Sequence, residues 1–278
     1  MRVMTWNVWW RFGPWEQRRK AILTVLRTAR PDVVGLQEVW ARGEENLAAW
    51  LAKELGMHWT WAASDAPERW QERLGDSAVE IGNAVLSRWP IADRDVVRLP
   101  AAEGDDDGRL ALHALVDAPA HPLPFFTTQL SSAPHASAVR CEQVRAFAEF
   151  IAAHRRDGPF PPVTTGDYNA WPDSDEVRLF GGYKTAPAVP GQVLVDAWEY
   201  ADPTTPSATW DAANPFAAQT FEPSVRIDYI HVGAPGPGGI GRVRSVQRVG
   251  DGPVDGVWPS DHAAVVADLA GEPLQDRH

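Results

Sequence analysis

Strand-like runs that end in polar side chains are the feature that most constrains how this chain folds. The run VTTGDYN (163–169) reads as a buried strand and then presents Asp167 and Asn169 two residues apart. Four more runs carry polar groups at or near an end, and these are Asn7, Glu38, Asp228, and Asp261 with His262. A strand needs none of them, and a buried acid destabilises a fold unless it is paired or hydrogen-bonded. The pattern favours a sheet whose strand ends meet at one rim.

Helices and strands alternate along the chain, with more strands than helices. Apolar residues at helical spacing predict helices over 16–30, 44–55 and 137–155 and short helical pieces near 174–180 and 193–200. Short apolar runs predict strands over 3–8, 32–39, 59–63, 81–87, 95–99, 110–116, 124–130, 163–165, 226–232, 242–248 and 263–269. The sequence contains neither a Gly-x-Gly-x-x-Gly motif nor a Gly-rich phosphate loop followed by Lys. This order predicts a mixed, layered α/β domain and not a doubly wound sheet.

Each of the polar residues also has a structural interpretation when it is taken alone. Asn7 suits a turn, and Glu38 suits the cap of the helix that follows. GDYN is a good turn sequence, and SDH (260–262) reads equally as a solvated loop. Asp228 lies within RIDYI, where Arg226 on the same strand face is as good an explanation as catalysis.

Taken together, these side chains indicate a metal site. Clustered carboxylates repel one another and need a cation. Carboxylate and amide oxygens form a hard ligand set that suits Mg²⁺ or Mn²⁺ better than Zn²⁺. An Asp beside a His fixes the imidazole tautomer and raises its basicity. The combination predicts the hydrolysis of a phosphate ester.

Six short motifs together resemble the endonuclease/exonuclease/phosphatase superfamily, which has the deoxyribonuclease I-like fold. They are TWNV (5–8), LQEV (36–39), GNAVLSRWPI (82–91), GDYNAWPDS (166–174), RIDYI (226–230) and SDHAAV (260–265). Each is weak alone, but they occur in the family's order and span nearly the whole chain. The resemblance implies an α/β (α+β) fold, a four-layered sandwich in which two mixed β-sheets face each other, with helices outside and the active site at the top edge.

The same resemblance implies phosphodiester hydrolysis with Mg²⁺ or Mn²⁺ as cofactor and a phosphate ester as substrate. It places Asn7 and Glu38 at the main metal, with Asp261 nearby. Asp167 and Asn169 would orient the attacking water and hold the phosphate in its transition state. His262, oriented by Asp228, would be the base or a phosphate-binding partner.

Gln129 departs from the pattern of the family, which has His in the strand-end sequence Thr-His-Leu. The run here is FFTTQLSSAP (125–134). Glutamine can hydrogen-bond a phosphate oxygen, but it cannot donate a proton as an acid. Three interpretations follow: the enzyme favours leaving groups that need no proton, a metal-bound water supplies the proton, or the chain is a weakened member that binds phosphoesters without turning them over. The intact motifs favour the active interpretations.

Charge bears on the choice of substrate. The net charge is −11 and no long basic stripe is present, which favours a small or flexible phosphodiester over long duplex DNA. The family resemblance implies nucleic acids, sphingomyelin, inositol phosphates or nucleotide-type esters as substrates, and the motifs do not choose among them. The loop over 64–80 is expected near the rim, where Arg69 and Trp70 either stack on a base or pack on their own loop. Arg109 either contacts phosphate or is an edge-strand charge.

Length and targeting features are consistent with a single cytoplasmic domain. No apolar run approaches the roughly 18 residues that a membrane helix needs, and the N-terminus does not read as a signal peptide. Cys141 is the single cysteine and cannot form an internal disulfide. We expect residues 1–270 to form one domain, residues 271–278 to form a frayed tail, and the chain to be a monomer.

Overall fold

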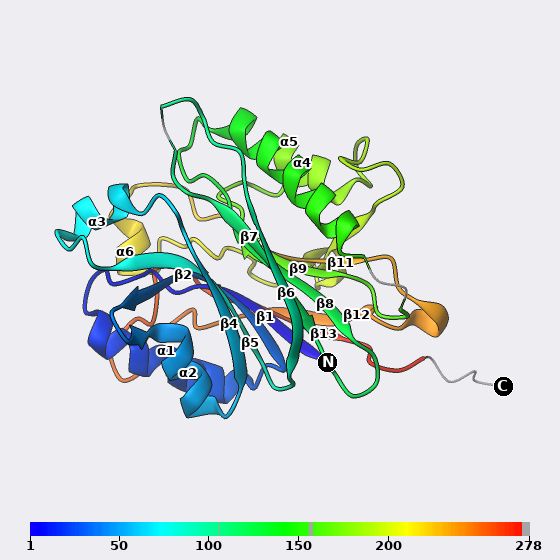
Figure 1. Cartoon of the computed structure of the whole chain (residues 1–278), viewed down its shortest axis with the longest axis horizontal. Coiled ribbons are helices and arrows are strands. Elements are labelled where there is room, and N and C mark those ends of the chain that lie inside the picture. The colour runs from blue at the N-terminus through cyan, green and yellow to red at the C-terminus, as the bar shows by residue number, and fades with distance from the viewer. Residues whose placement is uncertain (105, 156–157, 274–278) are drawn as a thin grey trace.

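Two β-sheets face each other at the centre of the computed structural model, which describes residues 1–104, 106–155 and 158–273 (Figure 1). The first sheet has the order β12 (Val243–Val249), β13 (Ala264–Leu269), β1 (Arg2–Asn7), β2 (Val33–Arg42), β5 (Glu80–Ser87) and β4 (His58–Ala63), with β3 (Glu45–Asn46) paired to β2. The second has the order β10 (Leu194–Asp196), β11 (Asp228–Gly233), β9 (Val163–Asp167), β8 (Leu123–Gln129), β7 (Leu110–Val116) and β6 (Ile91–Arg98). Both sheets are mixed, because β1 runs parallel to β2 and β8 parallel to β9, whereas the other pairs are antiparallel.

Helices cover the outer face of each sheet. Helices α1 (Trp15–Ala29) and α2 (Leu47–Leu55) lie on the first sheet, whereas α4 (Ser137–Ala153) and α5 (Asp175–Gly181) lie on the second (Figure 1). The remaining helical segments are α3 (Glu68–Leu74), α6 (Pro215–Ala218), and the 3₁₀ turns η1 (Ala197–Tyr200) and η2 (Pro237–Gly239). The order helix, sheet, sheet, helix is the four-layered sandwich that the family resemblance implies.

Side-chain alternation in the strands separates three apolar layers. In β1, Met4 and Trp6 pack toward α1 and α2, whereas Val3 packs into the space between the sheets. Phe125 of β8 points into that same space, and its neighbour Phe126 packs against α4. The central strands β1 and β8 are therefore buried on both faces, and the acids and amides of the predicted site lie at strand ends.

The structure corrects two of the predicted elements. The helical piece predicted over 193–200 is confined to the 3₁₀ helix η1, because residues 194–196 form strand β10 and pair with β11, and Asp196 then caps η1 by accepting a hydrogen bond from Trp198 N. The predicted loop over 64–80 contains helix α3, which buries Trp70. Within the described chain, none of the helices is long and apolar enough to cross a membrane. Residues 274–278 of the predicted tail lie outside the described residues.

Strand pairing brings the polar ends together. Asp167 of β9 is the register partner of Asp228 in β11 on one side and of Gln129 in β8 on the other. In the facing sheet, Asn7 ends β1 beside Gln37 of β2, one residue before Glu38. Residues that are far apart in the sequence therefore meet at one end of the sandwich.

Candidate active site

Glu38 reaches the rim because the backbone of β2 is irregular at that residue. Its φ is 54°, in the left-handed region that non-glycine residues rarely adopt. The β2–β5 register shifts between Leu36 and Val39, which marks a bulge. The helix that follows is capped by Asn46, whose side chain accepts from Ala49 N, so Glu38 is not a helix cap.

Two side-chain amides join the carboxylates of the two sheets. Asn7 Nδ2 lies 3.1 Å from Glu38 Oε1 and 3.0 Å from Asp167 Oδ2. Gln129 Nε2 donates to the same two oxygens, at 2.8 and 3.1 Å. Asn7 also forms a turn, which was the structural interpretation of this residue from the sequence, because its Oδ1 accepts a hydrogen bond from Trp9 N at 2.9 Å. Both amides therefore turn their NH₂ groups toward the acids.

Asp167 and Asn169 stay together at the end of β9. Asn169 has a φ of 48°, its backbone N donates to Asp167 Oδ1 at 3.0 Å, and its Nδ2 donates to Leu130 O at 3.0 Å. Burial raises the pKa of Asp167, and the charge of Asp228 adds to the rise, while His262 opposes it. Asp167 therefore takes up a proton more readily than an ordinary aspartate.

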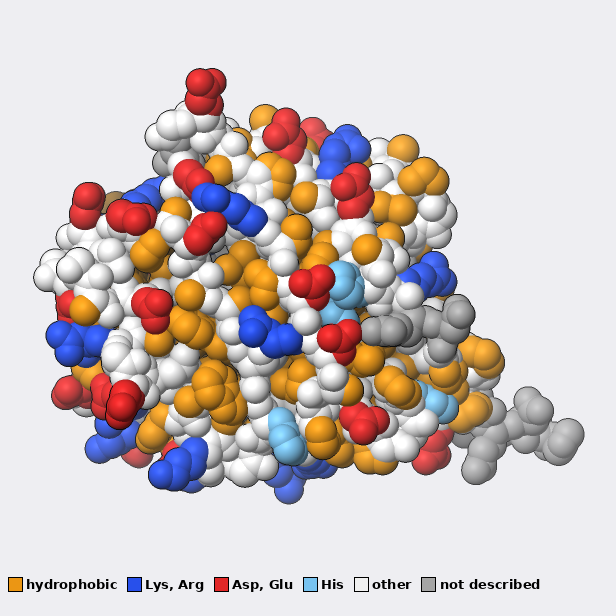
Figure 2. Space-filling model, in the orientation of Figure 1, with side chains coloured by type: hydrophobic (Ala, Val, Ile, Leu, Met, Phe, Trp, Pro, Cys, Tyr) orange, Lys and Arg blue, Asp and Glu red, His pale blue; other side chains and the backbone are white. Residues whose placement is uncertain are grey.

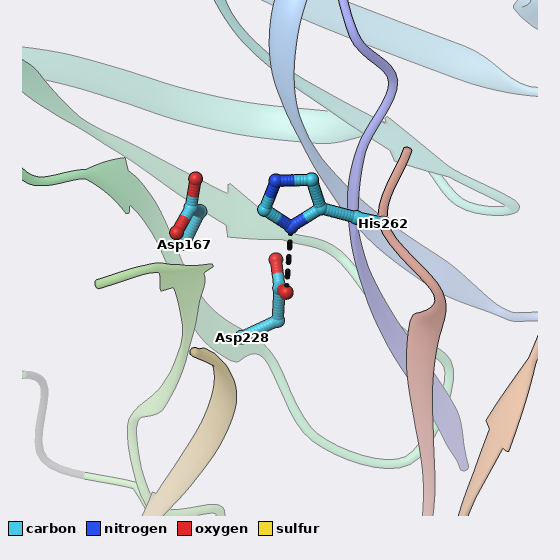
Figure 3. Close-up of side chains that lie close together, drawn as sticks. All are labelled: Asp167, Asp228 and His262. Carbon is cyan, nitrogen blue, oxygen red and sulfur yellow. Dashed lines mark hydrogen bonds and ion pairs between the residues drawn. The ribbon is translucent and has the colours of Figure 1, made fainter. Parts of the chain in front are cut away.

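His262 forms a buried pair with Asp228. The Nδ1–Oδ2 distance is 2.9 Å, and the ligand atoms of His262, Asp228 and Asp167 all lie within 4.8 Å of one another (Figure 3). Burial alone lowers the pKa of His262, but the nearby carboxylates outweigh it, so the pKa lies well above its usual value. The structure overturns the pairing of Asp228 with Arg226, because Arg226 binds Asp196 at 2.8 Å.

Asp261 lies in a buried segment, not in a solvated loop. Ser260 Oγ lies 2.7 Å from Asn7 O and 3.2 Å from Asp261 Oδ1, so one hydroxyl joins the ends of β1 and the segment before β13. Burial raises the pKa of Asp261 to about 7, and the negative charge of Glu38 contributes to the rise. The acids of the site are thus crowded together in a way that a cation relieves.

The donor set fits a hard divalent cation. Glu38 Oε2 is buried and has no hydrogen-bond partner among the described residues. Asp167, Asp228 and Asp261 add further carboxylate oxygens at the same rim. Oxygen donors of this kind are the ligands that Mg²⁺ and Mn²⁺ prefer.

Arg109 and Trp70 are both buried next to the site, and Trp70 packs with Arg69 and Arg73 of its own loop, as one of its sequence-based alternatives has it. Arg109 is not an edge-strand charge, because its Nε binds Asp107 at 2.8 Å and its guanidinium lies 5.4 Å from the ring of Trp70. Arg109 Nη2 has no partner among the described residues. It borders a small cavity of about 20 Å³ that Gln129 and Asn83 also line.

A larger cleft, with a volume of about 460 Å³, opens beside the catalytic candidates. Asn169 and Trp210 line the cleft, and the Trp210 ring lies 5.0 Å from that of His262. Trp171 lines the cleft with half of its surface exposed. No motif in the sequence singled out Trp210, whose place depends on the long loop before β11.

Comparisons with known proteins agree with this fold. A sequence profile described as the Endonuclease/Exonuclease/phosphatase family matches residues 4–262. Similar solved structures are humanized D. rerio TDP2 (19% identity, 97% of this chain and 98% of that chain, TM-score 0.72), the human Nocturnin catalytic domain with bound sulfate anion (20%, 97% and 94%, 0.69) and an endonuclease/exonuclease/phosphatase from Beutenbergia cavernae DSM 12333 (24%, 97% and 71%, 0.70). At these identities the structural likeness shows the fold alone. No curated protein sequence gives a significant match.

Proposed function

The chain belongs to the endonuclease/exonuclease/phosphatase family, and on that premise we propose that it hydrolyses a phosphodiester with Mg²⁺ or Mn²⁺ as cofactor. One observation carries the proposal. Glu38 from the first sheet, Asp167 from the second, and His262 from the segment before β13 meet at one rim, linked by amides and a buried acid. Such a group combines acids for a cation, a carboxylate for water and a charged imidazole for phosphate.

We assign the cation to Glu38, with Asn7 and Asp261 beside it. Glu38 Oε2 has no partner in the described chain, and a cation would favour the ionised form of Asp261. Asn7 holds the Glu38 carboxylate in place beside the cation, because its Nδ2 donates to Glu38 Oε1 at 3.1 Å. When bound, the cation supplies positive charge beside the phosphate as negative charge develops there.

The compact group of Asp167, Asp228 and His262 suits proton transfer better than metal ligation. His262 Nδ1 and Asp228 Oδ2 are already hydrogen-bonded to each other, so each has used an atom that a metal would need. This bond fixes the imidazole tautomer and leaves Nε2 for the substrate.

In our mechanism Asp167 receives the proton of the attacking water. Its carboxylate is buried and its pKa is raised, which brings it closer to the pH at which it must accept a proton. Asn169, whose backbone donates to Asp167, orients the water and contacts the phosphate. His262, held protonated by Asp228, donates from Nε2 to a phosphate oxygen and stabilises its growing charge.

We propose that the alcohol part of the substrate lies in the cleft between Trp171 and Trp210. Asn169 lines the cleft, so in this proposal the cleft lies next to the reacting phosphate. On the face shown in Figure 2, Lys and Arg side chains are scattered among acidic ones and do not form a stripe. Together with the net charge of −11, this favours a small or flexible phosphodiester, and nucleic acid stays a possible substrate without being required.

A second candidate function rests on Gln129. Its amide donates to both Glu38 and Asp167, so it takes part in holding the acids together. It cannot donate a proton to a leaving group as an acid. The alternative is therefore a member of the family that binds phosphoesters and has weakened turnover.

We further propose that residues 1–270 work as one domain and that the chain acts as a monomer. Strand β1 at the N-terminus pairs with β13 near residue 270, so both ends of this range belong to one sheet. Light scattering during size-exclusion chromatography tests the monomer, and a chain that ends at residue 270 should keep its turnover.

One assay separates the enzyme from the binding protein. The chain is incubated with bis-(p-nitrophenyl) phosphate and Mg²⁺ or Mn²⁺, with EDTA and His262→Ala as the tests. His58→Ala is the matched control, because His58 is exposed at the opposite end of the first sheet. We expect turnover that EDTA and His262→Ala abolish and His58→Ala preserves. Cation binding without turnover of this or nucleic-acid substrates would support the binding protein instead.

A further inference from the structure

Arg18 of α1 is a buried charge whose hydrogen-bonding groups are all used by the main chain. It is 1% exposed, and among the described residues no carboxylate lies within hydrogen-bonding distance of its guanidinium. Its five N–H groups donate to five carbonyl oxygens at 2.8–3.0 Å, and these belong to Val8, Trp9, Trp10, Phe12 and Pro259. A guanidinium has five donors in a fixed fork, so none is left over.

The carbonyls come from the two segments that carry the proposed cation ligands. Four belong to the turn that follows Asn7, and the fifth belongs to Pro259, two residues before Asp261. The turn is strained, because Trp9 and Trp10 have φ values of 56° and 38°. Left-handed backbone is unfavourable for non-glycine residues, so it persists only where other contacts hold it.

We propose that Arg18 is a positioning residue for the cation site. Its guanidinium donates hydrogen bonds to carbonyls of both the turn after Asn7 and the segment before Asp261, and so it fixes the two segments relative to each other. This inference rests on the proposed function, since it takes Asn7 and Asp261 as the cation's neighbours. Ser260 works in parallel, because its hydroxyl lies 2.7 Å from Asn7 O. The ring of Trp9 packs over one face of the guanidinium, with its centroid 4.7 Å away.

The positive charge of Arg18 and its hydrogen bonds to the two segments have opposite effects on cation affinity. Substitutions of Arg18 can therefore separate the two roles. A buried positive charge near Glu38 and Asp261 repels a divalent cation. If charge were its whole role, Arg18→Met would strengthen cation binding and Arg18→Lys would leave it unchanged. If Arg18 positions the ligands, both variants weaken binding, because neither side chain can reach all five carbonyls.

The test measures Mn²⁺ affinity from the electron paramagnetic resonance signal of free Mn²⁺, with no substrate present, in folded Arg18→Met and Arg18→Lys proteins. Arg19→Met is the matched control, because Arg19 lies on the same helix and packs over Trp15 and Trp50. We expect both Arg18 variants to bind Mn²⁺ roughly 10–100-fold more weakly, the size typical for residues that orient metal ligands. We expect the kcat for bis-(p-nitrophenyl) phosphate to fall with little change in KM, and Arg19→Met to match the unaltered protein.

The inference is overturned if folded Arg18→Met binds Mn²⁺ as tightly as Arg19→Met, or more tightly. Should neither Arg18 variant fold, Ser260→Ala tests the same tie, and unchanged Mn²⁺ affinity there also overturns it. The Mn²⁺ affinity is measured without substrate, so its result does not depend on whether the protein is catalytically active. Weakened Mn²⁺ binding in a chain without turnover supports the role of Arg18 while refuting the proposed hydrolysis.

Discussion

His262 Nδ1 lies 2.9 Å from Asp228 Oδ2, and the Asp228 side chain is completely buried. The backbone around Asp228 is held as well, because its N–H donates to Thr209 Oγ1 at 3.2 Å. A buried carboxylate with an imidazole partner and a fixed backbone gives the ring a single orientation. The pair thus links a residue of β11 to the segment before β13 and sets the direction in which Nε2 points.

Asp228→Asn is therefore expected to lower kcat by about 10²–10³-fold, the range associated with losing a donor that stabilises charge in the transition state. The amide cannot hold the imidazole in its charged form, so phosphate binding by His262 is lost. Turnover of bis-(p-nitrophenyl) phosphate measures the effect, with Asp95→Asn as the control, since Asp95 is exposed on β6. A kcat within a few-fold of the unaltered protein would show that His262 acts without Asp228.

Gln129→His is expected to raise turnover for substrates whose leaving group needs a proton. The side chain at position 129 already donates hydrogen bonds to Glu38 and Asp167. A histidine there could also release a proton to the leaving group, which glutamine cannot do. The comparison uses an alkyl p-nitrophenyl phosphate and a dialkyl phosphate, and the gain should appear with the poorer leaving group. An unchanged or lower rate on both esters would mean that the amide suits this site because it ties the two acids together.

Much of the site follows from the sequence because the position of each strand along the chain and the side-chain type at its end are local properties. The strand-end positions of Asn7, Glu38 and Asp167 are visible as apolar runs that stop at a polar residue. The four-layered sandwich was predicted from the motifs and is confirmed by the structure and its relatives.

Partners across strands could not be predicted in the same way. Arg226 is two residues from Asp228 but binds Asp196, because β10 lies beside β11 and brings that acid across. The bulge at Glu38 depends on the pairing of β2 with β5. Arg18 gives no sequence signal at all, because its partners are main-chain carbonyls and these look alike in every sequence.

Mn²⁺ or Mg²⁺ is expected to raise the melting temperature of the protein. A ligand present at 100 times its Kd adds about 2.7 kcal/mol of stability, which corresponds to roughly 5 °C for a chain of this size. Differential scanning fluorimetry with and without EDTA measures the shift. Glu38→Gln should remove most of it, whereas Glu45→Gln, at an exposed position of β3, should leave it intact. An equal shift in both variants would place the cation away from Glu38.

His231 is expected to make the fold less stable in mild acid. Burial lowers the pKa of His231 from 6.5 to about 4, and its ring stacks against Tyr168 and Tyr229. The unfolded chain therefore binds a proton at a pH where the folded chain does not. The contribution of His231 to the free energy of unfolding is complete above pH 6.5 and is lost as the pH falls from 6.5 to 4, by about 1.4 kcal/mol per pH unit and about 3 kcal/mol in total.

Urea unfolding at several pH values tests this, with His231→Gln as the variant and His58→Gln as the control. Other groups also titrate in this range, so the quantity to compare is the difference in slope between the proteins. His231→Gln is less stable at neutral pH, because the buried ring contacts are lost, but its free energy of unfolding should fall less steeply below pH 6.5. His58 is exposed and its substitution should not change the slope. Parallel curves for the unaltered protein and His231→Gln would mean that His231 is not the group that resists protonation in the fold.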